Sequence, residues 1–254
     1  MSNDTLIIQA GLSDKPRKSK WPARLDLAQS ASGLFLALFM WLHMFFVASI
    51  CLGEDVMWTV TKFFEGYYFF GTAYPRLVSV VVGVVIVIFV THALLAVRKF
   101  PISYKQYKTY HAHMKSMRHE DTTLWMWQVY TGFAMFFLAS AHLYQMFVWP
   151  QEIGPYGSAD RMWSDMLWPF YLVLLLCVEF HGGIGLYRLA VKWCWPNATR
   201  DFLKKLKWAT TGFFLIIGFA TLFAYMKLGY EHRANYGEPY VPTSISQSIE
   251  GTYK

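Results

Sequence analysis

The sequence predicts an all-α integral membrane protein, a bundle of five transmembrane helices that forms a single membrane domain over residues 1–254. Two observations support this fold class. Hydrophobic residues make up 55% of the chain and charged residues only 15%, whereas soluble domains carry about 25% charged residues. Five apolar stretches also approach or exceed the roughly 20 residues that a helix needs to cross a bilayer. This composition argues against a disordered chain and against a water-soluble enzyme.

The five stretches follow one another with short polar segments between them, at residues 30–53, 77–97, 122–149, 166–191 and 208–226. The second is rich in Val and Ile, which in water would favour a buried strand. Its length predicts a helix instead, because a lone strand cannot satisfy its backbone hydrogen bonds in lipid. Residues 54–75 are aromatic and too short to span, so we expect them to lie at the outer membrane interface.

The distribution of Lys and Arg predicts the orientation of the bundle. The N-terminal flank contains five basic residues and the segment after the second stretch contains six. The end of the fourth stretch and the segment after it also contain six, counting Arg188. The segments on the opposite side contain two, one and three. The positive-inside rule therefore places the N-terminus, with residues 1–21, in the cytoplasm and the tail of residues 227–254 outside. The first apolar stretch is too long for a cleavable signal peptide. The net charge of +7 is therefore explained by the basic residues that flank the spans on the cytoplasmic side, and we expect no nucleic-acid partner.

Four of the eight histidines lie inside predicted spans: His43, His92, His142 and His181, one on each of the first four. We expect the other four in loops or the tail: His111, His113, His119 and His232. Ionisable groups within a membrane are costly and are functional candidates by default. The rise of an α-helix places His43 and His142 roughly 32 Å from the cytoplasmic ends of their helices, and His92 and His181 roughly 14 and 17 Å from theirs. The histidines therefore form two level pairs, an outer pair and an inner pair.

Two level pairs of imidazoles on four helices are what two bis-histidine haems of the b type require, since bundle cores hold cofactors between facing helices. The two irons would lie roughly 15 Å apart along the membrane normal. A proton relay is the main alternative, although a relay would tolerate staggered depths. Zinc is disfavoured, because it takes at least three protein ligands. The three cysteines form no CxxC or CxxCH motif, which leaves iron–sulfur clusters and covalent haem without support.

Two acidic residues are candidates for proton transfer. Glu179 lies within the fourth span, two residues before His181, and therefore points away from the inner pair. The alternative to a proton-transfer role for Glu179 is an interhelical hydrogen bond. Glu65 lies in the aromatic outer segment, where it could accept a proton from a quinol hydroxyl. From the sequence alone, a solvated loop acid is the favoured interpretation of Glu65.

Basic residues and glycines complete the predicted site. Arg161 at the outer level and Lys99, with Arg98, at the inner level are candidate partners for haem propionates. Gly33 and Gly132 each lie ten residues before a histidine of the outer pair. Each glycine should therefore open a gap at the depth of the inner pair, where a flat ring could approach the backbone; ordinary helix packing is the alternative.

The chain closely resembles the dihaem cytochrome b membrane subunits of menaquinol:fumarate reductases, of the single-anchor, five-helix type. The resemblance covers the four histidine-bearing spans. It rests on QSASGLFLALFMWLHMFF (29–46), THALLAVRKFPISYKQY (91–107), RHEDTTLW (118–125), TGFAMFFLASAHLY (131–144) and VEFHGGIGLYRLAVKW (178–193).

The resemblance implies haem ligands at His43 and His142 for the outer haem and at His92 and His181 for the inner haem. It implies a menaquinol site involving Glu65 near the outer haem and a proton-route carboxylate at Glu179. The chain would anchor a flavoprotein subunit and an iron–sulfur subunit on the cytoplasmic side of a bacterial inner membrane, and a dimer of such heterotrimers is one expected assembly. Nothing in the chain itself predicts a flavin or fumarate site.

Three alternatives remain open at this point. The same chain could work in the opposite direction, as the anchor of a succinate:quinone reductase. It could be a haem-free anchor or a proton-conducting bundle. It could also be another bis-histidine cytochrome b, such as the anchor of a hydrogenase or a formate dehydrogenase.

Overall fold

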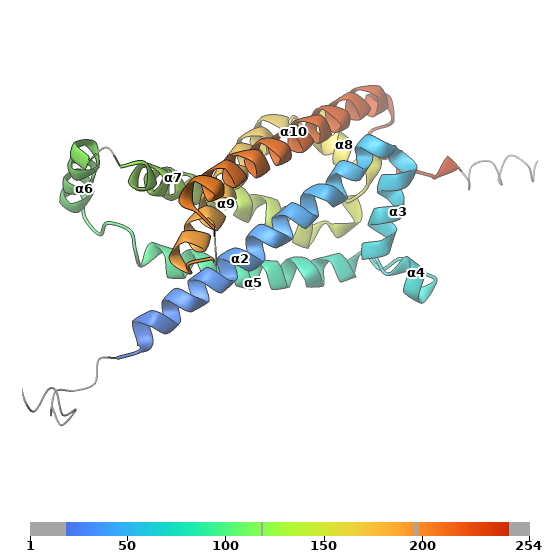
Figure 1. Cartoon of the computed structure of the whole chain (residues 1–254). Helices are drawn as coiled ribbons and strands as arrows, with labels where there is room; N and C mark the ends of the chain where they lie inside the picture. Colours follow the sequence, from blue (N-terminus) through green and yellow to red (C-terminus); the bar gives the residue numbers. More distant parts are fainter. Residues whose placement is uncertain (1–18, 118, 196–197, 244–254) are drawn as a thin grey trace, which may run out of the picture.

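The computed structural model describes residues 19–117, 119–195 and 198–243, and all regular elements in these ranges are helices. Five helices are long and apolar enough to cross a membrane, which confirms the predicted number of spans. They are α2 (Trp21–Ala48), α5 (Arg76–Val97), α7 (Glu120–Val148), α9 (Trp168–Lys192) and α10 (Arg200–His232). These five helices run side by side as a bundle (Figure 1).

Short helices occupy the two ends of the bundle. They are η1 (Ser49–Leu52), α3 (Glu54–Phe64), α4 (Tyr67–Phe70), α6 (Tyr104–Met117), η2 (Pro150–Glu152), α8 (Pro155–Trp163) and η3 (Arg233–Asn235). Helices α3, α4 and α8 gather at one end, which we call the α3 end, whereas α6 stands beside the opposite end (Figure 1). We call that opposite end the basic end, because Arg98, Lys99 and Lys192 lie there.

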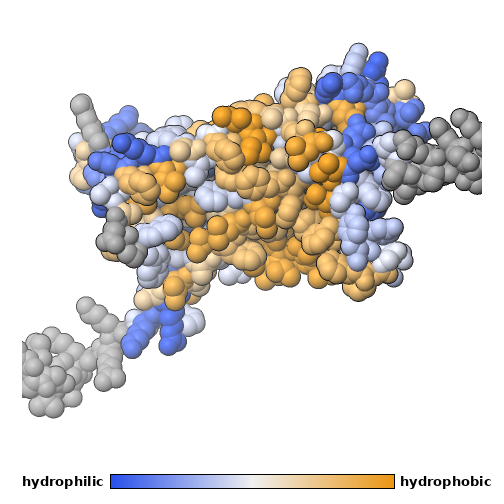
Figure 2. All heavy atoms as spheres, turned by 45° about the vertical axis from the view of Figure 1, so that its right-hand side comes forward, coloured by the Kyte–Doolittle hydropathy of each residue, from blue (hydrophilic) through white to orange (hydrophobic). Residues whose placement is uncertain are grey.

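The surface of the bundle is apolar around its middle. Figure 2 shows hydrophobic residues in a broad band across the centre of the molecule, with hydrophilic residues at its two ends. On α5, for example, Val80, Val87 and Leu94 are 65%, 66% and 69% exposed. Their spacing of seven residues places them on one face of the helix. A contiguous apolar belt of this kind is favourable only in contact with lipid.

Helix α10 is longer than the predicted fifth span. It begins at Arg200, where the side chain of Thr199 accepts a hydrogen bond from the backbone N–H of Phe202 and caps the helix. It continues to His232, past Lys227, where we expected the tail to begin. Helix α2 likewise begins at Trp21, with a proline in its first turn. Most of the expected N-terminal segment, residues 1–18, lies outside the described residues.

The extension of α10 is held by very close packing against α8. A Cβ atom at Gly229 would lie 2.3 Å from the backbone oxygen of Ala159, so only glycine allows this approach. The neighbouring His232 is buried, and its Nδ1 lies 2.9 Å from Oδ1 of Asp160. We expected His232 in the tail or a loop, which is wrong, because this packing continues α10 to that residue.

A second correction concerns the segment after α5. We expected His111 and His113 in a loop, but both lie on helix α6. The helix forms because residues 104–117 contain no Gly or Pro and therefore no strong helix breaker. Tyr107 attaches it to α7 through a hydrogen bond of 2.6 Å between its hydroxyl and that of Tyr130.

Candidate functional site

The four histidines of the spans meet in two pairs inside the bundle. The ring centroids of His43 on α2 and His142 on α7 lie 6.1 Å apart. Those of His92 on α5 and His181 on α9 lie 6.5 Å apart. The structure therefore brings together the same partners that helix rise predicted from the sequence.

The separation within each pair fits a metal ion held between the two rings. Two metal–nitrogen bonds of about 2 Å and two ring radii of about 1 Å add up to about 6 Å between centroids. Among the described residues, no group of three or more His, Cys, Asp or Glu side chains is placed to hold a metal ion. Each site therefore offers two imidazoles and no more, a donor set that suits an iron whose other ligands come from a macrocycle.

Hydrogen bonds orient both rings of the inner pair. The Nδ1 atom of His181 lies 3.0 Å from the backbone oxygen of Gln128, which can only accept. The Nδ1 atom of His92 lies 3.1 Å from Oγ of Ser32. That hydroxyl donates to the carbonyl of Gln29, so it accepts the proton of the imidazole. Both rings therefore carry their proton on Nδ1 and keep the lone pair of Nε2 free for a metal.

In the outer pair, a hydrogen bond at Nδ1 orients the ring of His142 in the same way. Its Nδ1 atom lies 3.3 Å from the hydroxyl of Tyr171, which donates to Oε1 of Gln145 at 3.0 Å. The hydroxyl is thus left to accept from His142, whose Nε2 stays free. The ring of His43 is instead stacked on Phe39, with centroids 6.0 Å apart. Sequence reasoning missed Ser32, Gln128 and Tyr171, because nothing in their local pattern marks them as partners of distant histidines.

Two glycines lie against the inner pair. A Cβ atom at Gly33 would lie 2.8 Å from Cε1 of His92, and a Cβ atom at Gly132 would lie 2.8 Å from Cε1 of His181. Both glycines lie at the depth of the inner pair, as predicted, whereas the gap for a macrocycle stays a prediction. The ring that approaches each glycine is the imidazole of the neighbouring helix.

Glu65 is buried at the α3 end, with only 2% of its surface exposed. Its carboxylate forms an ion pair of 2.5 Å with Lys62, one turn earlier on α3. Its backbone oxygen accepts a hydrogen bond from the N–H of Tyr74 and closes the loop between them. The interpretation of Glu65 as a solvated loop acid is therefore wrong, because the side chain is buried and paired with Lys62.

Glu179 is buried on α9, with 1% of its surface exposed. Its Oε1 atom has no hydrogen-bond partner among the described residues. One turn further on, a Cβ atom at Gly183 would lie 2.3 Å from Oγ1 of Thr211 on α10. Residues four apart share a helix face, so Glu179 lies on the side of α9 that packs against α10.

Arg161 is a buried cation at the α3 end. It lies on α8 with 4% of its surface exposed and donates to the backbone oxygen of Glu152 at 3.0 Å. Its Nε atom is buried and has no partner among the described residues. Its charge acts on His142 and Tyr171, so the guanidinium lies close to the outer pair. This position fits the outer-level anion partner that the sequence predicted.

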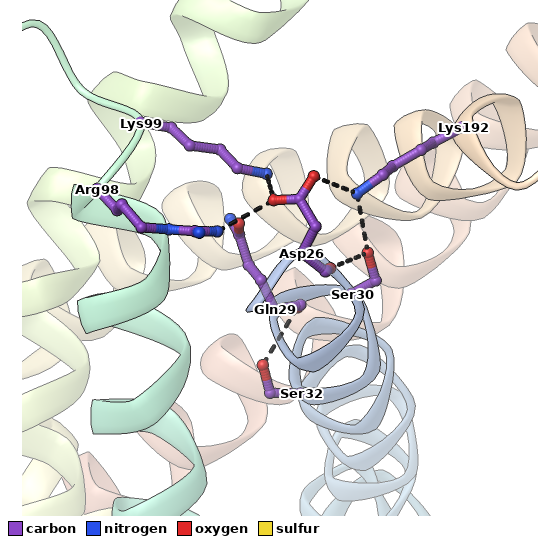
Figure 3. A network of polar contacts seen from close by, with 7 residues as sticks. All are labelled: Asp26, Gln29, Ser30, Ser32, Arg98, Lys99 and Lys192. Atoms are coloured by element: carbon purple, nitrogen blue, oxygen red, sulfur yellow. Dashed lines mark hydrogen bonds and ion pairs between the residues drawn. The ribbon is translucent and has the colours of Figure 1, made fainter. Parts of the chain in front are cut away.

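Lys99 lies at the basic end within a cluster around Asp26 (Figure 3). The carboxylate of Asp26 lies 3.0, 2.9 and 3.2 Å from the cationic nitrogens of Arg98, Lys99 and Lys192. The Lys192 ammonium also donates to Ser30 at 3.5 Å. One carboxylate among three cations leaves the cluster net positive and able to bind a further anion. Sequence reasoning missed Asp26, because its three basic partners lie far from it in the sequence or on other helices.

Comparisons with known proteins identify the family. Residues 104–222 match the family described as succinate dehydrogenase/fumarate reductase transmembrane subunit. A fumarate reductase cytochrome b subunit of Wolinella succinogenes is 52% identical over 237 residues, which cover 91% of this chain and 93% of the relative. Two further subunits of that name, from Helicobacter pylori strains J99 and 26695, are 51% and 50% identical over 89% of both chains. The chain belongs to the fumarate reductase cytochrome b subunit family.

Family membership agrees with the architecture. A cytochrome b subunit of fumarate reductase is the membrane part of an oxidoreductase complex, and five apolar helices provide the membrane anchor. The matched range 104–222 contains one histidine of each pair, His142 and His181, together with Glu179. In this family, fumarate chemistry belongs to the complex, whereas this chain contributes its membrane-embedded part.

Proposed function

We propose that this chain is the dihaem cytochrome b anchor of a menaquinol:fumarate reductase. It oxidises menaquinol near the outer histidine pair and passes electrons through two bis-histidine haems of the b type to an iron–sulfur subunit. The observation that carries the proposal is the spacing of the two imidazole pairs, 6.1 and 6.5 Å between ring centroids. A proton relay needs neither this spacing nor two level pairs.

The residues around each pair have distinct roles in this proposal. His43 and His142 hold the outer iron through Nε2, and His92 and His181 hold the inner iron. Bound haem supplies reversible one-electron transfer, and its potential depends on its axial ligands and its surroundings. Cationic side chains hold the propionates: Arg161 at the outer level, and Lys99 and Arg98 at the inner level.

Glu65 receives a proton during quinol oxidation. Menaquinol loses two electrons and two protons to become menaquinone, and a carboxylate beside the hydroxyl can take up one proton as the electrons leave. The burial of Glu65 and its ion pair with Lys62 support this role, because they hold the carboxylate in a fixed position away from bulk water. A haem held by His43 and His142 would supply the one-electron acceptor for this oxidation.

Glu179 is the second proton-transfer carboxylate of the proposal. Its burial at the α9–α10 contact and its unpartnered oxygen support a site where a proton or a water molecule binds in the course of turnover. An intramembrane carboxylate without a partner is costly and is therefore a functional candidate.

The basic end faces the cytoplasm of a bacterium in this proposal, and the chain is embedded in its inner membrane. A flavoprotein subunit and an iron–sulfur subunit bind there, and two such heterotrimers can form a dimer. The excess of Lys and Arg at this end of the sequence supports the orientation. The α3 end, with Glu65 and Arg161, then faces outward.

A redox-titrated absorption spectrum of the purified complex tests the proposal. We expect a b-type band that titrates as two one-electron components, one for each haem, and reduction of both by a menaquinol analogue. A spectrum without a b-type band would overturn the proposal and leave a haem-free anchor. The direction of physiological turnover follows from the same titration, because fumarate reduction requires haem potentials near that of menaquinone.

A further inference from the structure

Helix α6 covers a hollow of about 730 Å³ at the basic end, a volume typical of small-ligand pockets. The helix stands beside the bundle in Figure 1, between the ends of α5 and α7 in sequence. The hollow is lined by Lys99, Phe100, Pro101, Lys105, Gln106, Thr109, Tyr110, His113 and Trp125. Of the lining residues, only Lys99 has been assigned a role so far.

The lining of the hollow is basic. It contains Lys99, Lys105 and His113 and no Asp or Glu. Lys99 is already paired with Asp26. In the part of the chain that the structure describes, the side chains of Lys105 and His113 form no ion pair or hydrogen bond. The hollow therefore carries a positive charge that attracts an anion. Two of its donor side chains, those of Lys105 and His113, have no partner among the described residues.

The hollow also lies at the depth of lipid headgroups. Lys99 and Phe100 lie two and three residues after Val97, the last residue of α5. Trp125 lies about 6 Å along α7 from Asp121 by helix rise, and its ring packs against Tyr110 with centroids 4.7 Å apart. Trp and Tyr are enriched at this level of membrane proteins.

Exposed apolar residues also lie at the end of α5, close in sequence to Lys99 of the hollow. In the last turn of α5, Leu94 and Val97 are 69% and 58% exposed. A ligand that places a charged group beside Lys105 can therefore place hydrocarbon against α5. An acidic segment of a soluble protein would match the charge but not these apolar residues.

We propose that the hollow under α6 binds the headgroup of an anionic phospholipid. Lys105 and His113 hold the phosphate, with Lys99 nearby, the glycerol backbone lies against Tyr110 and Trp125, and the acyl chains cover the exposed end of α5. Basic pockets at the cytoplasmic membrane surface are known to recognise anionic headgroups in this way. The site is separate from both histidine pairs, and of its lining residues only Lys99 is also a proposed propionate partner.

Helix α6 offers a matched control at positions that do not line the hollow. Lys105 and His113 line the hollow, whereas Lys108 and His111 on the same helix do not. The variant Lys105→Gln/His113→Gln and the control Lys108→Gln/His111→Gln therefore change the same residue types and the same charge. Each intact complex is purified in mild detergent after incubation with equal phosphatidylglycerol and phosphatidylcholine. Retained lipid is then counted by native mass spectrometry.

We expect wild type and the control to retain phosphatidylglycerol in preference to phosphatidylcholine, and the hollow variant to retain at least fivefold less. Equal retention by all three proteins, or equal loss in both variants, would overturn the proposal. Loss of the soluble subunits from the hollow variant with unchanged lipid retention would also overturn it, since the occupant would then be a protein. Unchanged helix content by circular dichroism excludes misfolding, and the single exchange Lys105→Gln replaces the double variant if that content falls.

Discussion

Gly33 of α2 and the imidazole of His92 on α5 are in direct contact, since a Cβ atom at position 33 would lie 2.8 Å from Cε1 of the ring. Gly132 of α7 stands in the same relation to His181 of α9. Each inner histidine is thus held between a hydrogen bond at Nδ1 and a glycine at its side. The absence of a side chain at these two positions fixes how far each ring enters the bundle.

Gly33→Ala is therefore expected to displace His92 and to lower the occupancy of the inner haem while the outer haem remains. Forcing a methyl group into such a contact costs about 1–3 kcal/mol, enough to reduce occupancy severalfold. Haem per chain and the redox-titrated spectrum measure the effect. Gly212→Ala is the control, because a Cβ atom at Gly212 would have no neighbour within 4 Å. A Gly33→Ala spectrum equal to that of the control would contradict the prediction.

The sequence predicts the bundle and the histidine pairs because both depend on one-dimensional quantities. Hydrophobic length decides which helices can span a membrane, and helix rise converts a position such as His43 into a depth. Only histidines at equal depth can meet, so the pairing of His43 with His142 follows without any knowledge of how the helices pack. The spacing of Gly33 from His43 carries the same depth information.

Other features depend on contacts between distant parts of the chain and could not be predicted. Ser32 and Tyr171 orient their histidines because the helices are rotated toward each other, and rotation is not visible in a short apolar sequence of low amphipathicity. The burial of Glu65 depends on the tertiary packing of the segment after α2, which its local sequence does not reveal. The helical continuation to His232 depends on the contact of α10 with α8.

Replacement of His142 by Ala should remove the outer haem and leave the inner one. His43 and His142 face each other across 6.1 Å, and neither ring is paired with His92 or His181. A bis-histidine site with one ligand loses most of its haem, so about half of the total haem per chain should remain. A redox titration should then show one component in place of two. Equal loss from both components would refute the pairing of the rings, and His92→Ala provides the reciprocal experiment.

Attachment of the C-terminal tail to α3 should depend on pH. The Asp55 carboxylate accepts hydrogen bonds from the hydroxyl of Tyr240 at 2.8 Å and from the N–H of Thr243 at 3.1 Å. These bonds, with that of Tyr240 the strongest, lower the pKa of Asp55 below its usual value. A lowered pKa in the folded state means that the bonds contribute stability above the unfolded pKa of about 3.9. That contribution is lost as the pH falls through the lower, folded value.

Limited proteolysis at neutral and acidic pH measures this attachment. Near Tyr240, the tail should be protected at pH 7 and cleaved several times faster below about pH 4, using an acid-active protease with a soluble peptide as the rate standard. Asp55→Ala should show the fast rate already at pH 7. Equal rates for wild type and Asp55→Ala at pH 7 would show that other contacts hold the tail.

Glu65→Gln should abolish quinol oxidation without removing haem. Glutamine keeps the size of the side chain but cannot take up a proton, and loss of a positioned base costs about 10²–10⁴-fold in rate. The measurement is menaquinol-dependent fumarate reduction by the intact complex, with haem content from the spectrum. Glu231→Gln is the control, because Glu231 is exposed and pairs only with Lys227 at 3.8 Å. Fumarate reduction with a reduced viologen as electron donor should stay normal in both variants, since it bypasses the quinol site. Quinol-driven turnover at the wild-type rate in Glu65→Gln would mean that another group receives the proton, and the buried ion pair with Lys62 would then serve only to hold α3 in place.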